Sequence, residues 1–238
     1  MNYTEIRENI WQIADDDGGY CTLVKGNKLA VLWDTGFGKQ NLKGFIEGHV
    51  QTKYIAINSH GHPDHIGGNR QFERIYAGES ALDEIIYYTK EISDIPIDYK
   101  LEILKIGQVL DLGGIHAEVI SLAGHTRGSI GLLIPEKQLL LAGDAFNPCL
   151  WMFNYGAMPI CQLKNTLSSV RQLPFDTYLC GHSDQEIPRH MLDVHLKNIE
   201  SMRIETSRKS ITLGMETYES IYEEDGLQSV IVYAEELL

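Results

Sequence analysis

Ser59-His60-Gly61-His62-Pro63-Asp64-His65 is the run of residues that decides the fold of this chain. It places three histidines and an aspartate within six positions, directly after an apolar, strand-like run at 54–58. If this part of the chain is extended, His60 and His62 point to the same side, so both can bind one cation. Imidazole and carboxylate groups are the ligands expected for zinc, and also for iron or manganese. The run therefore predicts a metal site at the end of a buried strand.

The second half of the same run suits a second cation. Asp64 and His65 are adjacent, so they face differently from the two preceding histidines. Gly61, Pro63 and the pair Gly67-Gly68 favour a tight loop here over a helix.

Further polar residues lie at the ends of other strand-like runs. Asp34, Asp144 and His182 come within two residues of an apolar run, and His125 follows another run after a short Ala-Gly loop. Ligands at strand ends are carried on a rigid frame, which is how a geometry-sensitive site is held. These residues therefore join the metal-site hypothesis.

The remaining sequence alternates between short strands and helices, which favours the α/β class. We predict strands at 20–24, 28–33, 54–58, 117–122, 129–134, 138–142 and 178–180. Helices are predicted at 40–47, 80–89, 162–173 and 188–203, the last opening with Pro188 in its first turn. Two β-rich halves, each followed by helices, suggest sheets packed on each other with helices outside.

Five motifs resemble those of the metallo-β-lactamase superfamily and occur in the order of that family. They are Asp34-Thr35-Gly36 (DTG), 59–68 (HxHxDH with Gly-Gly), 123–129 (GHTxGS), Ala142-Gly143-Asp144 and Cys180-Gly181-His182. The resemblance implies an αββα sandwich of two mixed β-sheets flanked by helices. We therefore treat residues 1–238 as a single domain. Within it, 210–238 is expected to form a C-terminal cap, as a helix over the active-site mouth, or a dimer contact.

The resemblance also implies the ligands and the reaction. One divalent ion is assigned to His60, His62 and His125, a second to Asp64, His65 and His182, with Asp144 bridging them and Asp34 supporting the ligands from behind. Zinc is the first choice of metal, with iron or manganese as alternatives. A metal-bound hydroxide would attack a thioester, lactone or phosphoester, because shared coordination lowers the pKa of bound water. Asp64, Asp144 and His182 are taken as the catalytic residues.

Differences between this sequence and the patterns of individual subfamilies narrow the choice of subfamily. True β-lactamases of the superfamily lack the bridging residue that Asp144 resembles, and flavodiiron proteins have Glu where this chain has His62. The β-CASP nucleases insert a domain before the last ligand, but Asp144 and His182 are only 182 − 144 = 38 positions apart. Glyoxalase II and the lactonases keep all seven ligands. Two other classes stay open, a mononuclear iron persulfide dioxygenase-like oxidoreductase and a metabolite-binding module with little turnover.

Residues 145–159 depart from the glyoxalase II pattern, in which basic residues hold glutathione. The segment has no Lys or Arg and is rich in aromatic residues and methionine. One interpretation is an apolar wall on which Phe146, Trp151 and Tyr155 contact a small-molecule substrate. The other is packing against a neighbouring helix or against the partner in a homodimer.

Composition sets the remaining expectations. The net charge of −13 disfavours nucleic acid as a partner, and no apolar run is long enough to span a membrane. Four cysteines without a CxxC pair suit a reducing compartment, and the N-terminus has no signal-peptide pattern, so a cytoplasmic protein is expected. The other histidines, His49, His116, His190 and His195, are expected to be structural, the last two on a polar helix face.

Overall fold

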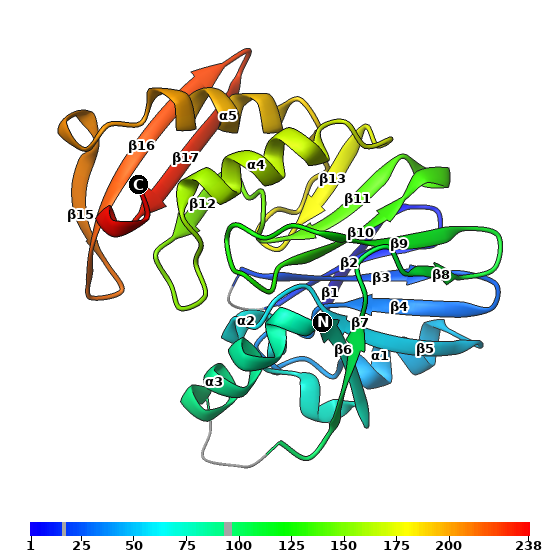
Figure 1. Cartoon of the computed structure of the whole chain (residues 1–238). Helices are drawn as coiled ribbons and strands as arrows, with labels where there is room; N and C mark the ends of the chain where they lie inside the picture. The colour runs from blue at the N-terminus through cyan, green and yellow to red at the C-terminus, as the bar shows by residue number, and fades with distance from the viewer. Residues whose placement is uncertain (16–17, 93–96) are drawn as a thin grey trace.

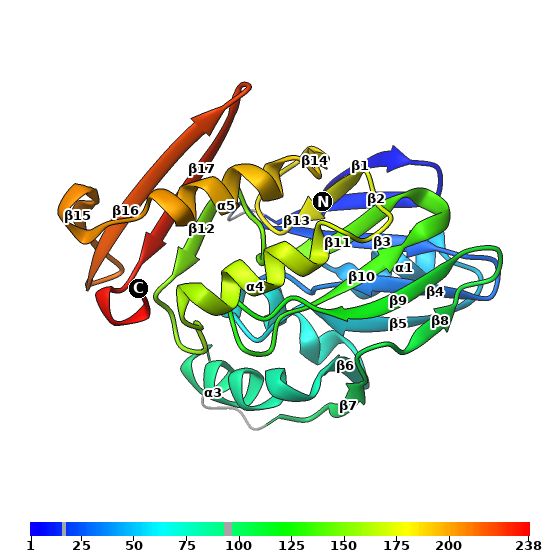
Figure 2. The ribbon, with the colours of Figure 1, turned by 45° about the horizontal axis from the view of Figure 1, so that its top comes forward.

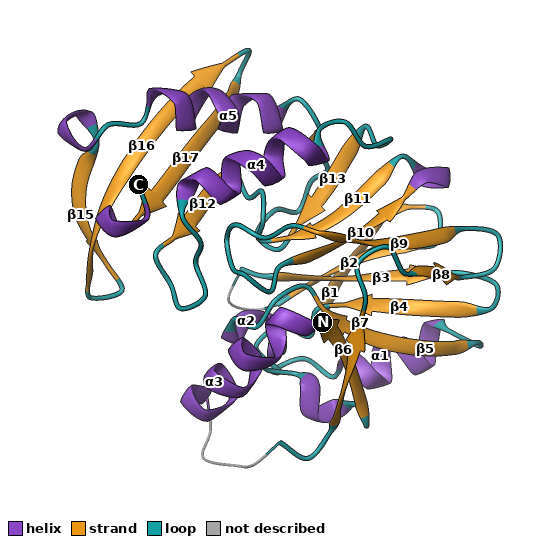
Figure 3. Cartoon of the chain, viewed as in Figure 1, coloured by secondary structure: helices purple, strands orange, loops and turns teal. Residues whose placement is uncertain are grey.

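Two β-sheets packed face to face, with helices on the outer face of each, form the body of the molecule (Figure 1). The computed structural model describes residues 1–15, 18–92 and 97–238. The architecture is the αββα sandwich predicted from the sequence. A third, smaller sheet lies beside one end of the sandwich, as Figure 3 shows by secondary structure.

The first sheet has seven strands that neighbour one another in chain order. They are β1 (Asn2–Arg7), β2 (Ile10–Ala14), β3 (Tyr20–Lys25), β4 (Leu29–Trp33), β5 (Lys53–Asn58), β6 (Arg74–Gly78) and β7 (Lys100–Leu104). The pairs are antiparallel up to β4 and parallel from β4 to β7. Parallel neighbours need crossover connections, and these contain α1 (Leu42–His49), α2 (Pro63–Ile66) and α3 (Leu82–Ile92).

The second sheet is assembled from the middle of the chain. Its order is β14 (Ile187–Pro188), β13 (Thr177–Cys180), β11 (Leu139–Gly143), β10 (Ile130–Ile134), β9 (His116–Ser121) and β8 (Val109–Asp111). Its outer face is covered by α4 (Ile160–Val170) and α5 (Met191–Ser201), which lie side by side in Figure 2. None of the helices in the described parts of the chain is long and apolar enough to cross a membrane.

Burial on both faces of each sheet creates the layers. Val31 of β4 packs in the inner layer with Leu132 of β10. The next residue, Leu32, points the other way and packs with Phe45 of α1. Successive strand residues face opposite sides, so the near-continuous apolar runs of the central strands bury both faces.

The predicted strands are all present, with each end shifted by at most one residue. Two local predictions are wrong. Pro188 pairs with Thr177 in β14, so the helix begins only at Met191. The expected tight loop after His62 instead contains the short helix α2. Pro63 occupies its first turn, where a backbone N–H would have no partner within the helix, so the missing N–H of proline costs nothing there.

The third sheet corrects the expectation of a C-terminal helix over the mouth. Its order is β12 (Cys149–Met152), β17 (Leu227–Tyr233), β16 (Met215–Glu224) and β15 (Arg208–Thr212). Residues 210–238 therefore form strands and end in a short 3-10 turn at Glu235–Leu237. The run Ser229–Tyr233, which is rich in β-branched and aromatic residues, suits a half-buried strand better than a helix. β12 comes from the 145–159 segment, which thus packs against the C-terminal strands.

His195 on α5 is fully buried, so its placement on a polar helix face was wrong. The Nδ1 atom of His195 lies 2.8 Å from Ser229 Oγ on β17. Asn198 Nδ2 donates to the carbonyl oxygens of Ser229 and Ser220 at 3.0 and 3.1 Å. The face of α5 that looked polar in sequence is covered by the third sheet. Burial lowers the pKa of His195 to about 4.

This buried imidazole predicts a loss of stability in mild acid. The pKa of His195 is lower in the folded protein than its value of about 6.5 in an unfolded chain, so the unfolded state binds the proton first. The free energy of unfolding should therefore fall as the pH drops below about 6.5. His195 alone should account for about 2 kcal/mol between pH 7.5 and pH 5.

Urea unfolding across this pH range measures the effect. His195→Asn keeps a polar atom near the Nδ1 position but cannot titrate, so its unfolding free energy should fall less steeply than that of the wild type. The exposed His190, replaced by Asn, provides the control and should follow the wild type. Parallel pH profiles for the wild type and His195→Asn would contradict the interpretation.

Candidate metal centre

The seven predicted ligands come together in space. The neighbouring elements α2, α3 and β12 lie along one edge of the sandwich in Figure 1. The seven ligands form two groups, and within each group the ligand atoms lie within 4.8 Å of one another. The three-histidine group consists of His60, His62 and His125, and the mixed group of Asp64, His65, Asp144 and His182. The loops after β5, β9, β11 and β13 supply these residues, so four strand ends fix the site.

Asp144 contacts both groups. Its Oδ1 lies 3.3 Å from His65 Nε2, and its Oδ2 lies 3.1 Å from His182 Nε2. The same Oδ2 is 3.8 Å from His125 Nε2 in the three-histidine group. One carboxylate therefore stands between the two sets of ligands, where the sequence placed a bridge.

The unpaired atoms of the cluster fit divalent cations. Nε2 of His60, His62 and His65 and Oδ1 of Asp144 are buried and have no hydrogen-bond partner among the described residues. Buried polar atoms almost always have partners, so their convergence needs another explanation. Imidazole nitrogens and carboxylate oxygens in this number are the donor set of zinc, iron or manganese.

The opposite ring nitrogens are held by hydrogen bonds. His60 Nδ1 lies 2.9 Å from Ser59 Oγ, and His125 Nδ1 lies 2.7 Å from the carbonyl oxygen of Trp151. Partners of this kind fix the tautomer and the ring plane of a metal-binding histidine. His62 Nδ1 and His125 Nε2 face one another at 3.0 Å.

Asp34 connects the two groups from behind. Its Oδ1 accepts from Ser59 N at 2.7 Å, and its Oδ2 accepts from Ser59 Oγ at 2.8 Å. Oδ2 also lies 2.9 Å from His65 Nδ1. The residue has φ of +64°, a left-handed conformation that Asp tolerates better than most residues. This strained backbone at the end of β4 aims one carboxylate at His65 directly and at His60 through Ser59.

Two glycines next to ligands permit close approach. A Cβ at Gly181, which precedes His182, would lie 2.3 Å from Asp144 Oδ1. A Cβ at Gly143, which precedes Asp144, would lie 2.4 Å from Ser59 Oγ, and Gly143 has φ of +53°. Their place in the family-like motifs thus has a steric reason.

The electrostatics of the two groups differ. Burial lowers the pKa of His62 to about 3 and also lowers the pKa of His60 and His125. These rings therefore stay neutral and keep a lone pair for a cation. Burial also lowers the pKa of His182, but the Asp144 carboxylate outweighs it and raises this pKa to about 10. A cation bound to the mixed group would displace that proton.

The site opens to solvent on the side of the mixed group. The side chains of His182 and Asp64 are 38% and 19% exposed, whereas the three-histidine group is buried. Water and a substrate can therefore reach the ligands from this side.

Of the residues predicted to contact substrate, Phe146 does not reach the mouth. Its side chain is fully buried and packs edge-on against Tyr178, with ring centroids 6.1 Å apart. Phe146 precedes β12, and its ring belongs to the core formed by the second sheet with α4 and α5. Trp151 and Tyr155 are 37% and 50% exposed.

The sequence missed two aromatic residues of α3. Tyr87 stacks on Tyr155 at 4.2 Å, and Tyr88 lies edge-on to His62 at 5.2 Å. They belong to no motif, and only the three-dimensional fold brings α3 beside the ligands. We call Tyr87, Tyr88 and Tyr155, whose rings contact one another, the aromatic wall.

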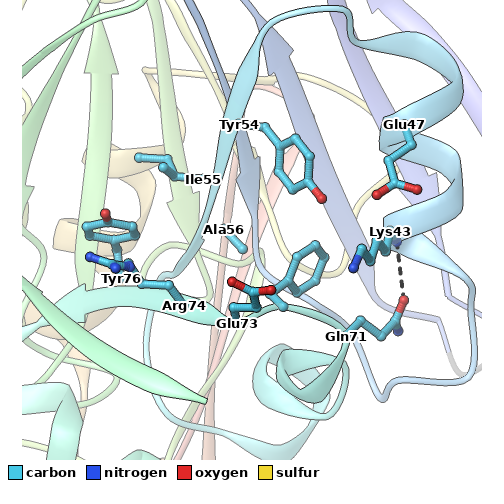
Figure 4. Close-up of a pocket in the computed structure, with 10 residues that line it drawn as sticks. Lys43, Glu47, Tyr54, Ile55, Ala56, Gln71, Glu73, Arg74 and Tyr76 are labelled. Carbon is cyan, nitrogen blue, oxygen red and sulfur yellow. Dashed lines mark hydrogen bonds between the residues drawn. The ribbon is translucent and has the colours of Figure 1, made fainter.

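A separate cavity lies away from the ligands, between α1, β5 and β6 (Figure 4). It measures about 400 Å³, and its lining includes Lys43, Glu47, Tyr54, Gln71 and Arg74. None of the predicted ligands contributes to it, and its charges are mixed, so it has no part in the chemistry of the metal centre.

Comparison with known proteins agrees with this geometry. The family model described as "Metallo-beta-lactamase superfamily" matches residues 14–182. A hydroxyacylglutathione hydrolase of Pelagibacter ubique is 24% identical over 79% of this chain and 76% of its own length. The acyl-coenzyme A thioesterase MBLAC2 of Homo sapiens is 27% identical over 58% of each chain. Against other hydroxyacylglutathione hydrolases, the chain spans about half the length of the relative.

A metallo-β-lactamase from Pontibacter korlensis has a similar structure, with a TM-score of 0.64. It is 17% identical and is matched over 84% of this chain and 99% of its own. This likeness concerns the fold alone.

Asp34→Asn should weaken metal binding without unfolding the protein. Asn tolerates the left-handed backbone as well as Asp does. Its NH₂ group, however, is a donor and would face another donor, either the Nδ1–H of His65 or those of Ser59. His65 would then favour the tautomer that carries its proton on Nε2, the atom needed for a cation. Changes behind the ligands typically reduce metal affinity about 10–100-fold. Zinc titration against a chromogenic chelator measures this loss, with the exposed Asp111→Asn as control. Wild-type affinity in Asp34→Asn would disprove the role of Asp34.

Proposed function

Because the chain belongs to the metallo-β-lactamase superfamily, we propose that it is a dinuclear metal-dependent hydrolase that cleaves an ester-type bond, with a thioester as the favoured substrate. The observation that carries the proposal is the pair of residue groups joined by Asp144, with four buried polar atoms that have no hydrogen bond in the described chain. The relatives' names support a thioester over a lactone or phosphoester, since they denote an acylglutathione hydrolase and an acyl-coenzyme A thioesterase. We propose zinc as the metal, with iron or manganese as alternatives.

His60, His62 and His125 would hold one ion, and Asp64, His65 and His182 the other. Bound there, such ions would supply a water activated as a nucleophile and would stabilise the negative charge that develops on a carbonyl oxygen.

The residues of the chain supply orientation. Asp144 keeps the two groups at a fixed separation. Asp64 is partly exposed, and its Oδ2 lies 3.1 Å from His182 Nε2 and 3.5 Å from His65 Nε2. Burial raises the pKa of Asp64, but the imidazoles of His65 and His182 have the larger combined effect, and the net pKa is lowered. The carboxylate is therefore ionised at neutral pH and can accept a hydrogen bond from the attacking water.

The aromatic wall supports an apolar acyl group on the substrate. Tyr88 contacts the ring of His62, and the exposed Tyr87 and Tyr155 contact Tyr88. Residues 145–159 contain no Lys or Arg, so this segment itself offers no cation to a charged group. Exposed aromatic side chains gain free energy by covering apolar surface.

Metal content and turnover test the proposal together. Protein purified without chelators or a histidine tag should carry about two zinc, iron or manganese ions per chain, as measured by elemental mass spectrometry. It should hydrolyse acyl thioesters. His62→Ala and Asp144→Ala should lose at least about 10³-fold in kcat/KM, because each removes a ligand from the centre. Their circular dichroism should remain that of the wild type.

Two results would count against the hydrolase. Full turnover and full metal content in both variants would show that the reaction takes place elsewhere. A single iron per chain, with sulfite produced from a persulfide, would favour an oxidoreductase.

Tyr155→Ala should raise KM for a medium-chain acyl thioester about 5–10-fold, because a stacked aromatic contact of about 1 kcal/mol or more is lost. The kcat, and the KM of the acetyl analogue, should stay within about twofold. Tyr155→Phe keeps the ring and should behave as the wild type. A fall in kcat for Tyr155→Phe would instead indicate that the hydroxyl takes part in the reaction.

A further inference from the structure

Glu84 is a buried carboxylate for which the proposed chemistry has no use. It lies in the first turn of α3, and its side chain is only 3% exposed. A carboxylate is costly to bury unless its oxygens accept hydrogen bonds. Its partners therefore explain why the residue is tolerated there.

Within the described residues, the Glu84 carboxylate accepts three hydrogen bonds, and all come from the loops that carry the three-histidine group. Gly61 N, between His60 and His62, donates to Oε2 at 3.3 Å. Thr126 Oγ1, next to His125, donates to Oε2 at 2.9 Å, and Gly128 N donates to Oε1 at 2.9 Å. One carboxylate thus joins two loops that are separated by more than sixty residues in sequence.

The packing around Glu84 leaves little room for movement. A Cβ at Gly61 would lie 2.4 Å from Glu84 Cβ, and a Cβ at Gly128 would lie 2.4 Å from Ala81 Cα. The start of α3 therefore touches the backbone of both loops. The backbone of Gly156 also packs closely against Glu84, since a Cβ added at Gly156 would lie 2.8 Å from Glu84 Oε1.

We propose that Glu84 is a positioning residue that sets the spacing of His60, His62 and His125 and thereby the affinity of the three-histidine group for its metal ion. This inference rests on the proposed metal centre. It is specific to one group, because none of the three donors lies beside Asp64, His65, Asp144 or His182 in sequence. Asp34, by contrast, serves His65 and, through Ser59, His60.

Glu84→Gln tests the proposal with nearly the same shape. Whichever way the amide turns, its NH₂ group faces a backbone N–H, that of Gly61 or that of Gly128. Thr126→Val removes one donor, whereas Thr126→Ser keeps the hydroxyl and should rescue the loss. Asp83→Asn, an exposed neighbour on the same turn of α3, is the matched control.

Stepwise zinc binding to the metal-free protein is the readout, measured by titration against a chromogenic chelator. His125→Ala and His182→Ala identify which binding step belongs to which group. In Glu84→Gln the step of the three-histidine group should weaken at least tenfold, in line with changes behind metal ligands, while the other step stays within twofold. Thr126→Val should weaken the same step by a smaller factor. Thr126→Ser and Asp83→Asn should match the wild type.

Unchanged affinities in Glu84→Gln, or an equal weakening of both steps, would overturn the role of Glu84, the second result indicating a general effect on the fold. Either result leaves the metal centre intact if the wild type binds two ions. If the wild type fails to bind two ions, the proposed function itself is wrong.

Discussion

The orientation of imidazole rings by hydrogen bonds from behind is the constraint on which the rest of this structure depends. A ring nitrogen can face a cation only if the opposite nitrogen is held, and here Ser59, Asp34 and the carbonyl of Trp151 hold those of His60, His65 and His125. These hydrogen bonds offset part of the cost of burying so many polar groups. The ring nitrogens on the opposite side lie close to one another and to the carboxylate oxygens, and together these atoms form the candidate metal centre.

α3 links the candidate metal centre to the aromatic wall. Glu84 joins the loops of the three-histidine group, and one turn later Tyr87 and Tyr88 form part of the aromatic wall. Residues three and four positions apart share a helix face, which is why one helix can serve both purposes. A shift of α3 would therefore alter metal ligands and substrate contacts together.

The third sheet is coupled to the same centre through β12. Trp151 pairs with Val232 of β17, and its carbonyl oxygen lies 2.7 Å from His125 Nδ1. The buried contacts of His195 and Asn198 with Ser229 attach α5 to that sheet. The C-terminal strands therefore stabilise a segment that touches a ligand, although they lie outside the 14–182 region that the family model matches.

The strands that bury both faces could be predicted from the sequence by itself, because apolar runs are local signals. The αββα class and the seven clustered residues followed from motifs at strand ends, through the resemblance to the superfamily. Asp34 could be found in the same way, within its DTG motif. Tertiary structure alone decided the places of Glu84, Tyr87, Tyr88 and His195, since each depends on which surface packs against its helix. The helix face of His195 looks polar until β17 covers it, and Phe146 looks available to a substrate although its ring is buried against Tyr178. Side-chain periodicity tells which residues share a face of an element, but not what lies opposite that face, and long-range packing supplies that information.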